Sequence, residues 1–190
     1  MKKGIIIILC LLNVQAFAQW KSYYPEGKSK NNKEVKKKID KDNLMFDTYF
    51  FNALKTKSLE NYEEALDQFQ KCIKMDDKQA VPFYESALIN KRLGNLNLAV
   101  EQAKITVELE GNNRWYQLNY AEVLFANQDF KSASIEYKKL LLIEPGNKEL
   151  YFLLADMYIY DNDFLKAIDI YNDLEQIKGI DKMVSMQALN

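Results

Sequence analysis

The sequence predicts an all-α fold, a right-handed superhelical solenoid of helix-turn-helix repeats. Three observations support this prediction: two ladders of alanines that share one interval of 34 residues, and a polar turn that recurs between them. The first ladder comprises Ala53, Ala87, Ala121 and Ala155, and the second comprises Ala65, Ala99, Ala133 and Ala167. A period of this length is typical of stacked repeats, in which each unit leaves an apolar face for its neighbour to cover.

Each unit is predicted to be a helix, a short polar turn and a second helix. The turns lie between the two alanines of a unit, at residues 59–61, 94–95, 127–129 and 161–163. On the second helix, the residue three before the alanine and the residue four after it share one face with it. The residues before it are Tyr62, Leu96, Phe130 and Phe164, and those after it are Phe69, Ala103, Tyr137 and Tyr171. Alanine at a helix crossing permits interaxial distances near the lower end of about 8 to 10 Å.

This pattern resembles the tetratricopeptide repeat family, over about residues 46–179. The resemblance implies four units at 46–79, 80–113, 114–147 and 148–181, in a repeat region that begins near residue 44. Two family features are sparse here, because the proline between units is present only as Pro145 and the leucine before the first small residue only as Leu154. The resemblance implies a solenoid that works as a protein-protein interaction scaffold.

The first 18 residues are predicted to be a signal peptide. Lys2 and Lys3 precede an apolar run from Gly4 to Val14, and residues 16–18 form a small-x-small cleavage site. The apolar run is much shorter than the roughly 20 residues needed to span a bilayer. Lipid attachment at Cys10 is disfavoured, because Leu9 stands where a small residue is expected. We therefore expect an exported protein, periplasmic or associated with the cell envelope, with no transmembrane segment after cleavage.

Residues 19–43 are predicted to be a flexible polar lead-in, rich in lysine and diluted by acidic residues. Trp20, Tyr23 and Tyr24 at its start leave open a docking of this segment on the first unit. The chain has a formal net charge of −1, which argues against a nucleic-acid partner.

Residue types needed for catalysis or metal binding are scarce. The chain has no histidine, and Cys72 is the single cysteine after the predicted cleavage. The acidic turn at residues 161–163 is followed by Leu165 and Lys166, where a calcium loop needs an oxygen ligand and a glycine. We expect no enzymatic activity, no catalytic residue, no metal and no cofactor, and we interpret Cys72 as a packing residue.

In this family the first helix of each unit lines an inner, concave face, which implies a partner-binding groove rich in aromatic residues. The predicted site residues are Phe50, Tyr84, Leu88, Arg92, Trp115, Glu122, Phe125, Phe152, Asp156 and Tyr160. Two interpretations stay open for its aromatic residues, which either fill the core or anchor a partner segment. Cations in the first two units and carboxylates in the last two would orient that partner.

The family's lysine and asparagine clamp for a terminal carboxylate is absent, because the corresponding positions are Phe50, Leu54, Tyr84 and Leu88. A hydrophobic peptide or a folded protein surface is therefore the expected partner.

Residues 180–190 are predicted to start a partial or capping helix that exposes apolar side chains. Three interpretations stay open: a cap that folds back, a truncated longer array, or an end covered by another subunit through self-association. The function predicted is an interaction scaffold of the bacterial cell envelope. The alternatives are an accessory subunit of an envelope assembly or secretion complex, and a structural subunit that forms oligomers through its C-terminal end.

Overall fold

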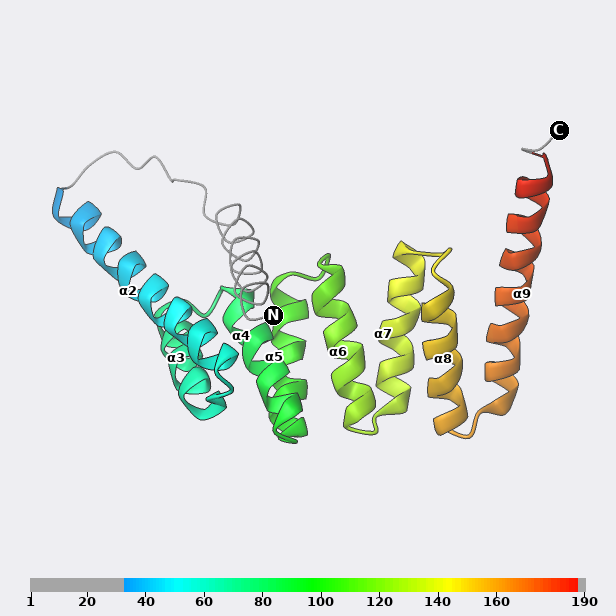
Figure 1. The fold of residues 1–190 in the computed structure, drawn as a ribbon, viewed down its shortest axis with the longest axis horizontal. Helices are drawn as coiled ribbons and strands as arrows, with labels where there is room; N and C mark the ends of the chain where they lie inside the picture. Colours follow the sequence, from blue (N-terminus) through cyan, green and yellow to red (C-terminus); the bar gives the residue numbers. More distant parts are fainter. Residues whose placement is uncertain (1–32, 188–190) are drawn as a thin grey trace, which may run out of the picture. The chain divides into compact units, whose positions relative to one another are not determined.

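The computed structural model describes the backbone of residues 33–187 and the side chains of residues 41–177. The predicted signal peptide, the first part of the lead-in and residues 188–190 lie outside this description. The described backbone forms eight helices joined by short turns (Figure 1). They are α2 (Lys33–Ser58), α3 (Tyr62–Met75), α4 (Ala80–Arg92), α5 (Leu96–Leu109), α6 (Arg114–Ala126), α7 (Phe130–Ile143), α8 (Lys148–Tyr160) and α9 (Phe164–Gln187).

The chain divides into two compact units, residues 1–41 and residues 42–190, and the account below concerns the second. In that unit, consecutive helices pack against one another from α3 to α9, and the part of α2 from residue 42 packs on α3 through Phe50 and Phe69, so that each helix pair of the predicted repeat is present. The all-α solenoid predicted from the alanine ladders is confirmed. None of the helices in the described part of the chain has the length and hydropathy needed to cross a membrane.

The four turns within the units lie where the sequence predicts them, and they share one backbone feature. The middle residue of each turn has a positive φ, between 60° and 79°. Only Gly94 takes this conformation without a steric penalty, whereas the other three positions have a side chain in the left-handed region. Those three residues are Glu60, Gln128 and Asn162. The short reversal ends the first helix and lets the second run antiparallel to it.

Side chains of asparagine and aspartate cap the N-termini of four of the described helices, and on α9 the Asp163 carboxylate accepts a hydrogen bond from the Lys166 backbone N–H at 3.3 Å. The Asn113 side-chain oxygen accepts a hydrogen bond from the Trp115 backbone N–H at 3.1 Å, and Asn147 does the same for Glu149 at 3.2 Å. Asp129 accepts from the Ser132 backbone N–H at 3.1 Å. Each such cap stabilises a helix by roughly 0.5 to 2 kcal/mol, because it satisfies a backbone donor that has no partner within the helix.

Both alanine ladders are buried in the core, where seven of the eight alanines have no exposed surface and Ala167 is 3% exposed. The buried residues form three clusters along the repeats. Aromatic rings fill the first cluster around Phe69 and the largest cluster around Tyr137. The middle cluster is built from small residues, Ala87, Ala99, Ala103 and Val123.

Two helices extend beyond their predicted bounds. α2 begins at Lys33, so the prediction of a flexible lead-in to residue 43 is wrong for its last part. No glycine or proline occurs between Lys33 and Ser58, and lysine and glutamate are good helix formers. α9 continues to Gln187 without a turn, so the separate helix predicted from residue 180 is not formed. Gly179 alone costs a helix only about 1 kcal/mol, and no proline interrupts the segment.

Candidate interaction face

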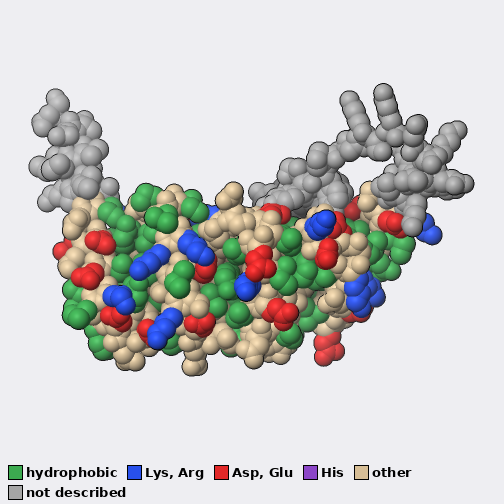
Figure 2. Space-filling model, turned by 180° about the vertical axis from the view of Figure 1, so that it is seen from behind, with side chains coloured by type: hydrophobic (Ala, Val, Ile, Leu, Met, Phe, Trp, Pro, Cys, Tyr) green, Lys and Arg blue, Asp and Glu red, His purple; other side chains and the backbone are tan. Residues whose placement is uncertain are grey.

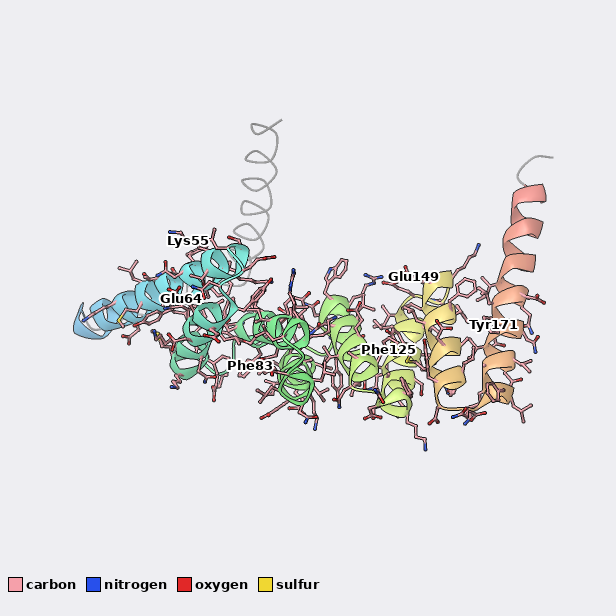
Figure 3. The ribbon with its side chains drawn as sticks, turned by 60° about the horizontal axis from the view of Figure 1, so that its bottom comes forward. Lys55, Glu64, Phe83, Phe125, Glu149 and Tyr171 are labelled. Atoms are coloured by element: carbon pink, nitrogen blue, oxygen red, sulfur yellow. The ribbon has the colours of Figure 1, made fainter. Side chains whose placement is uncertain are left out.

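The first helices of the four units contact one another through side chains. We call this surface the first-helix face and define it by the outward side chains of α2 from residue 42, α4, α6 and α8. Contacts between successive first helices join Lys57 to Glu85, Tyr84 to Tyr116, Lys91 to Glu122, and Phe125 to Tyr160. Four of the residues in these contacts, Tyr84, Glu122, Phe125 and Tyr160, belong to the predicted groove. In Figure 3, the labelled Phe125 and Glu149 lie on α6 and α8, two neighbouring first helices.

The N-terminal half of this face, from α2 to α4, is crossed by ion pairs. The Lys57 ammonium bonds to the Glu85 carboxylate, and Lys91 bonds to Glu122 on the next first helix at 2.7 Å. The four side chains are 15% to 46% exposed, which leaves both pairs partly screened by solvent. The charged groups on this half therefore already have partners.

The C-terminal half, formed by α6 and α8, presents an aromatic cluster instead, which Phe130 joins from the start of α7. The ring centroids of Phe125, Phe130 and Tyr160 lie 5.2 to 6.0 Å from one another, within the range of favourable aromatic pairs. Phe125 is 37% exposed and Tyr160 is 55% exposed. Ile159, which lies beside Tyr160 in sequence, is also exposed. The cluster is held in place by its own contacts while much of its surface remains in solvent.

Two further aromatic side chains lie on α6 and α8. Trp115 is 59% exposed, and the Arg114 guanidinium lies 4.9 Å from its ring centroid. Arg114 also pairs with Glu144 at the end of α7. The Asn147 side chain and Arg114 together lower the pKa of the Glu144 carboxyl by bonding to its charged form. Phe152, on α8, is exposed and has its ring centroid 6.2 Å from that of Tyr171.

Three predicted groove residues lie in or near the core. Phe50 is only 5% exposed and packs against Phe46 and Phe69, so its assignment to the groove is wrong. The reason is local, because Phe50 belongs to the aromatic cluster that fills the first unit. Tyr84 is half-buried against Tyr116, with ring centroids 5.0 Å apart, and burial raises the pKa of its hydroxyl. Leu88 is half-buried as well.

The predicted charge polarity is corrected by the ion pairs. The three cations from which this polarity was predicted are Lys57, Lys91 and Arg92, and each has an acidic partner, which for Arg92 is Glu60 at 3.2 Å. Glu122 is likewise neutralised by Lys91. Among the described residues, Glu149 and Asp156 on α8 have no ion-pair partner. These two carboxylates place unpaired negative charge in the last unit of the face.

Asn119 on α6 is a residue that the sequence patterns did not single out. Its side chain is 4% exposed, and neither atom of its amide has a hydrogen-bond partner among the described residues. It stands 34 residues after Glu85, which faces Lys57 across the first-helix face. A buried amide without partners is costly, which makes such a group a candidate for satisfaction by a bound molecule or by water. The repeat interval could have identified Asn119, because it places this residue at the position that Glu85 occupies in the preceding unit.

The Cys72 thiol is buried in the first unit and donates a weak hydrogen bond to the Phe46 carbonyl at 3.8 Å. Burial raises the pKa of this thiol to about 12. The thiolate form is therefore scarce at neutral pH, as expected for a residue that packs in a core.

Comparisons with known proteins agree with this architecture. Residues 57–79 match the sequence profile described as "Tetratricopeptide repeat". The fold is a tetratricopeptide repeat solenoid. No curated protein matches the chain.

Solved structures of such solenoids superpose on most of the chain. MamA from Desulfovibrio magneticus RS-1 is 19% identical, with a TM-score of 0.62 over 70% of this chain and 75% of the other. YrrB, described as "a TPR protein with an unusual peptide-binding site", is 21% identical, with a TM-score of 0.60 over 74% and 72%. The first TPR domain of Spaghetti (RPAP3), bound to an HSP90 peptide, is 22% identical, with a TM-score of 0.54 over 60% and 90%. Identities of this size establish the shared fold alone.

Proposed function

We propose that the protein is a non-catalytic scaffold that binds a segment of a partner protein on its first-helix face. The observation that supports this most directly is the aromatic cluster in which the exposed rings of Phe125 and Tyr160 pack against the half-buried Phe130. Rigid aromatic anchors of this kind dominate binding energy at protein interfaces. The likeness to YrrB and to the peptide complex of Spaghetti is consistent with a peptide partner.

The two halves of the first-helix face differ in what they offer a ligand. In the first two units the cations are paired with carboxylates, so a ligand would have to break these ion pairs to reach them. In the last two units, exposed rings stand beside Glu149 and Asp156, which have no ion-pair partner in the described part of the chain. A segment with an apolar or aromatic side chain and a nearby cation fits this half.

Selection of peptides from a displayed library on the mature chain tests this proposal. Selected peptides are expected to share an apolar residue beside lysine or arginine. Their affinity should fall by roughly tenfold in a Phe125→Ala, Phe152→Ala, Tyr160→Ala variant, since loss of anchors dominates interface energies. The matched control is Leu98→Ala on α5, which removes a side chain of similar exposure outside this face. Equal binding by the triple variant and the control would contradict the proposal.

We also propose that the scaffold acts in the bacterial cell envelope, alone or as an accessory subunit of an assembly or secretion complex. The support is the N-terminal sequence, in which Lys2 and Lys3, an apolar run and a small-x-small site follow in order. Mass spectrometry of the protein recovered from cell fractions tests this. A chain that begins at Gln19 in the envelope fraction is expected, and an intact chain in the cytosol would contradict it.

A second candidate function is self-association through α9. Ile168 on this helix is 54% exposed, whereas Ser134, at the same register position on α7, is 7% exposed. The packing of α7 against α8 covers that position in the third unit. Sedimentation of the mature chain at several concentrations tests this candidate. If the C-terminal end associates, the measured mass of the native chain should rise with concentration. The Ile168→Lys variant should keep the mass of a monomer. A constant monomer mass would rule it out.

A further inference from the structure

The second helices of the four units, α3, α5, α7 and α9, expose a regular strip of side chains. On α7 the strip consists of Lys131, Ile135, Lys138 and Leu142, whose spacing of four, three and four residues places them on one side of the helix. We call this strip, together with Lys139, the α7 outer strip. The equivalent positions on α3, α5 and α9 are all exposed too. The strip therefore faces solvent in every unit.

At two positions of this strip, α7 carries an apolar residue where the other three units carry a charged or polar one. The position of Ile135 is acidic in the three other units, where it is Asp67, Glu101 and Asp169. The position of Leu142 is polar in all three, where it is Lys74, Glu108 and Gln176. Ile135 is 54% exposed and Leu142 is 85% exposed. Packing within the repeat does not account for either side chain, because the same backbone positions carry charged or polar residues elsewhere.

The charge of the strip changes in the same unit. α7 carries three lysines and one glutamate, and that glutamate, Glu136, pairs with Lys139 at 2.8 Å. Among the described residues, Lys131 and Lys138 have no ion-pair partner. On α3 and α5, by contrast, the strip carries carboxylates at the position of Ile135 and contains one ion pair each, Lys71 with Asp67 and Lys104 with Glu108. Figure 2 shows lysine side chains set among hydrophobic ones toward the end of the repeats that carries α9.

We propose that the α7 outer strip is a second docking surface, separate from the first-helix face, for a partner helix that carries aliphatic side chains flanked by Asp or Glu. We infer an acidic partner from charge complementarity, because Lys131 and Lys138 lie on both sides of Ile135 and have no ion-pair partner among the described residues. The heptad spacing of Ile135 and Leu142 matches the repeat of apolar residues along one side of a partner helix.

The arrangement of the strip favours a protein over a lipid surface. A helix that lies in a membrane interface separates a broad apolar side from a cationic one. Here Lys138 lies between Ile135 and Leu142 on the same side, and its ammonium group is 5.3 Å from the ring centroid of Tyr158. Insertion of the two aliphatic side chains among acyl chains would also remove water from that ammonium group, at a high cost.

The probe for this surface is a synthetic helical peptide with two leucines seven residues apart and glutamates beside each. The control peptide has glutamine in place of every glutamate. Binding to the mature chain is measured by fluorescence anisotropy. The acidic peptide is expected to bind at least about fivefold more tightly than the control, and this preference should decrease with added salt.

The matched variant is Ile135→Glu with Leu142→Glu, which copies Glu101 and Glu108 of α5 and is therefore compatible with the helix. Binding of the acidic peptide should weaken by roughly tenfold in this variant. Lys131→Glu, which copies Glu63 of α3, is a second and smaller change, and it should also weaken binding. Phe125→Ala with Tyr160→Ala should leave it within twofold, which separates this surface from the first-helix face.

Three outcomes would overturn the proposal. They are no binding of the acidic peptide, equal binding by the native chain and the double glutamate variant, and capture by phosphatidylglycerol vesicles that depends on Ile135 and Leu142 while the peptide is not bound. The last outcome would assign the strip to a membrane surface.

Discussion

One register position on the first-helix face carries different chemistry in the two halves of the repeats. Lys57 and Lys91 occupy it in the first two units, whereas Phe125 and Ile159 occupy it in the last two. The lysines reach across to carboxylates on the next first helix, while Phe125 reaches across to the Tyr160 ring. The same backbone therefore carries charged side chains that pair with one another in one half and exposed aromatic side chains in the other.

This difference teaches that the repeat constrains its buried positions and leaves its exposed positions free. The alanine ladders recur in all four units because a larger side chain would separate the helices. Nothing in the packing of the repeat selects lysine or phenylalanine at the exposed position. Function in this molecule is consequently expected where one unit departs from the chemistry of the others. The first-helix face of units three and four and the outer strip of α7 are two such places.

The largest expected effect concerns the core that supports the aromatic half. Tyr137 is 1% exposed and belongs to the largest core cluster. Tyr137→Ala should reduce the free energy of unfolding by about 3 to 5 kcal/mol, because it removes a buried ring and leaves a cavity. Urea denaturation followed by circular dichroism measures this.

The control is Tyr171→Ala, at the same register position in α9, where the side chain is only half-buried and the loss should be smaller. Equal losses for the two variants would show that the C-terminal units do not share the packing described here.

The second prediction tests whether the Cys72 thiol is buried in the core of the first unit. The ordinary pKa of a cysteine thiol, 9.0, is raised to about 12 at Cys72. At pH 8, iodoacetamide should alkylate the native protein at least about 100-fold more slowly than the protein in urea, since the thiolate is the reactive form. Intact-mass spectrometry gives both rates.

The sign of the linked stability effect follows from the same shift. The pKa of Cys72 is higher in the folded state than in the unfolded state, so the stability that it contributes is fully present below pH 9. That contribution is lost as the pH rises toward 12. Similar alkylation rates for the native and unfolded protein would contradict a buried Cys72.

A third prediction compares the two halves of the first-helix face directly. For a peptide selected on the mature chain, Phe125→Ala with Tyr160→Ala should weaken binding by roughly tenfold, since exposed aromatic anchors are removed. Lys91→Met in the other half should change binding by less than twofold, because its charge is already paired with Glu122. Titration calorimetry of both variants checks this. A larger effect from Lys91→Met would place the site in the N-terminal half instead.

The smallest effect is the contribution of an ion pair to stability. A double-mutant cycle with Lys91→Met and Glu122→Gln should give a coupling of roughly 0.5 to 1 kcal/mol, because the pair is partly exposed. The coupling should decrease in high salt. The exposed pair of Arg92 and Glu60 serves as the reference, with side chains 66% and 70% exposed, and its coupling should be smaller. A larger coupling energy for Arg92 and Glu60 than for Lys91 and Glu122 would contradict the prediction that the less exposed ion pair contributes more to stability.

Much of the fold was predictable because packing repeats in the sequence. The two alanine ladders gave the helix pairs, and the polar segments gave the turns, including the one at Gly94. The helix ends that departed from the prediction are those at Lys33 and Gln187, where no neighbouring repeat sets the boundary. Local propensity continued both helices there, and no periodic pattern could have excluded this.

The predicted binding site stays a prediction, and the structure adds the exposure of each of its residues. Periodicity placed Phe50, Tyr84, Trp115 and Phe152 on corresponding parts of their helices, and it could not show that Phe50 is covered while Trp115 is 59% exposed. It could not pair Lys91 with Glu122, since that bond depends on how closely α4 approaches α6.

By itself, the sequence determined the repeat length, the helix pairs, the turns and the buried alanines, because each of these recurs at one interval and obeys the same packing constraint in every unit. Only the tertiary structure decided which aromatic side chains remain exposed, which charges are neutralised, and that α7 presents unpaired lysines beside Ile135 and Leu142. The physical reason is that burial and ion pairing depend on side chains from neighbouring helices, and those contacts form only when the units stack.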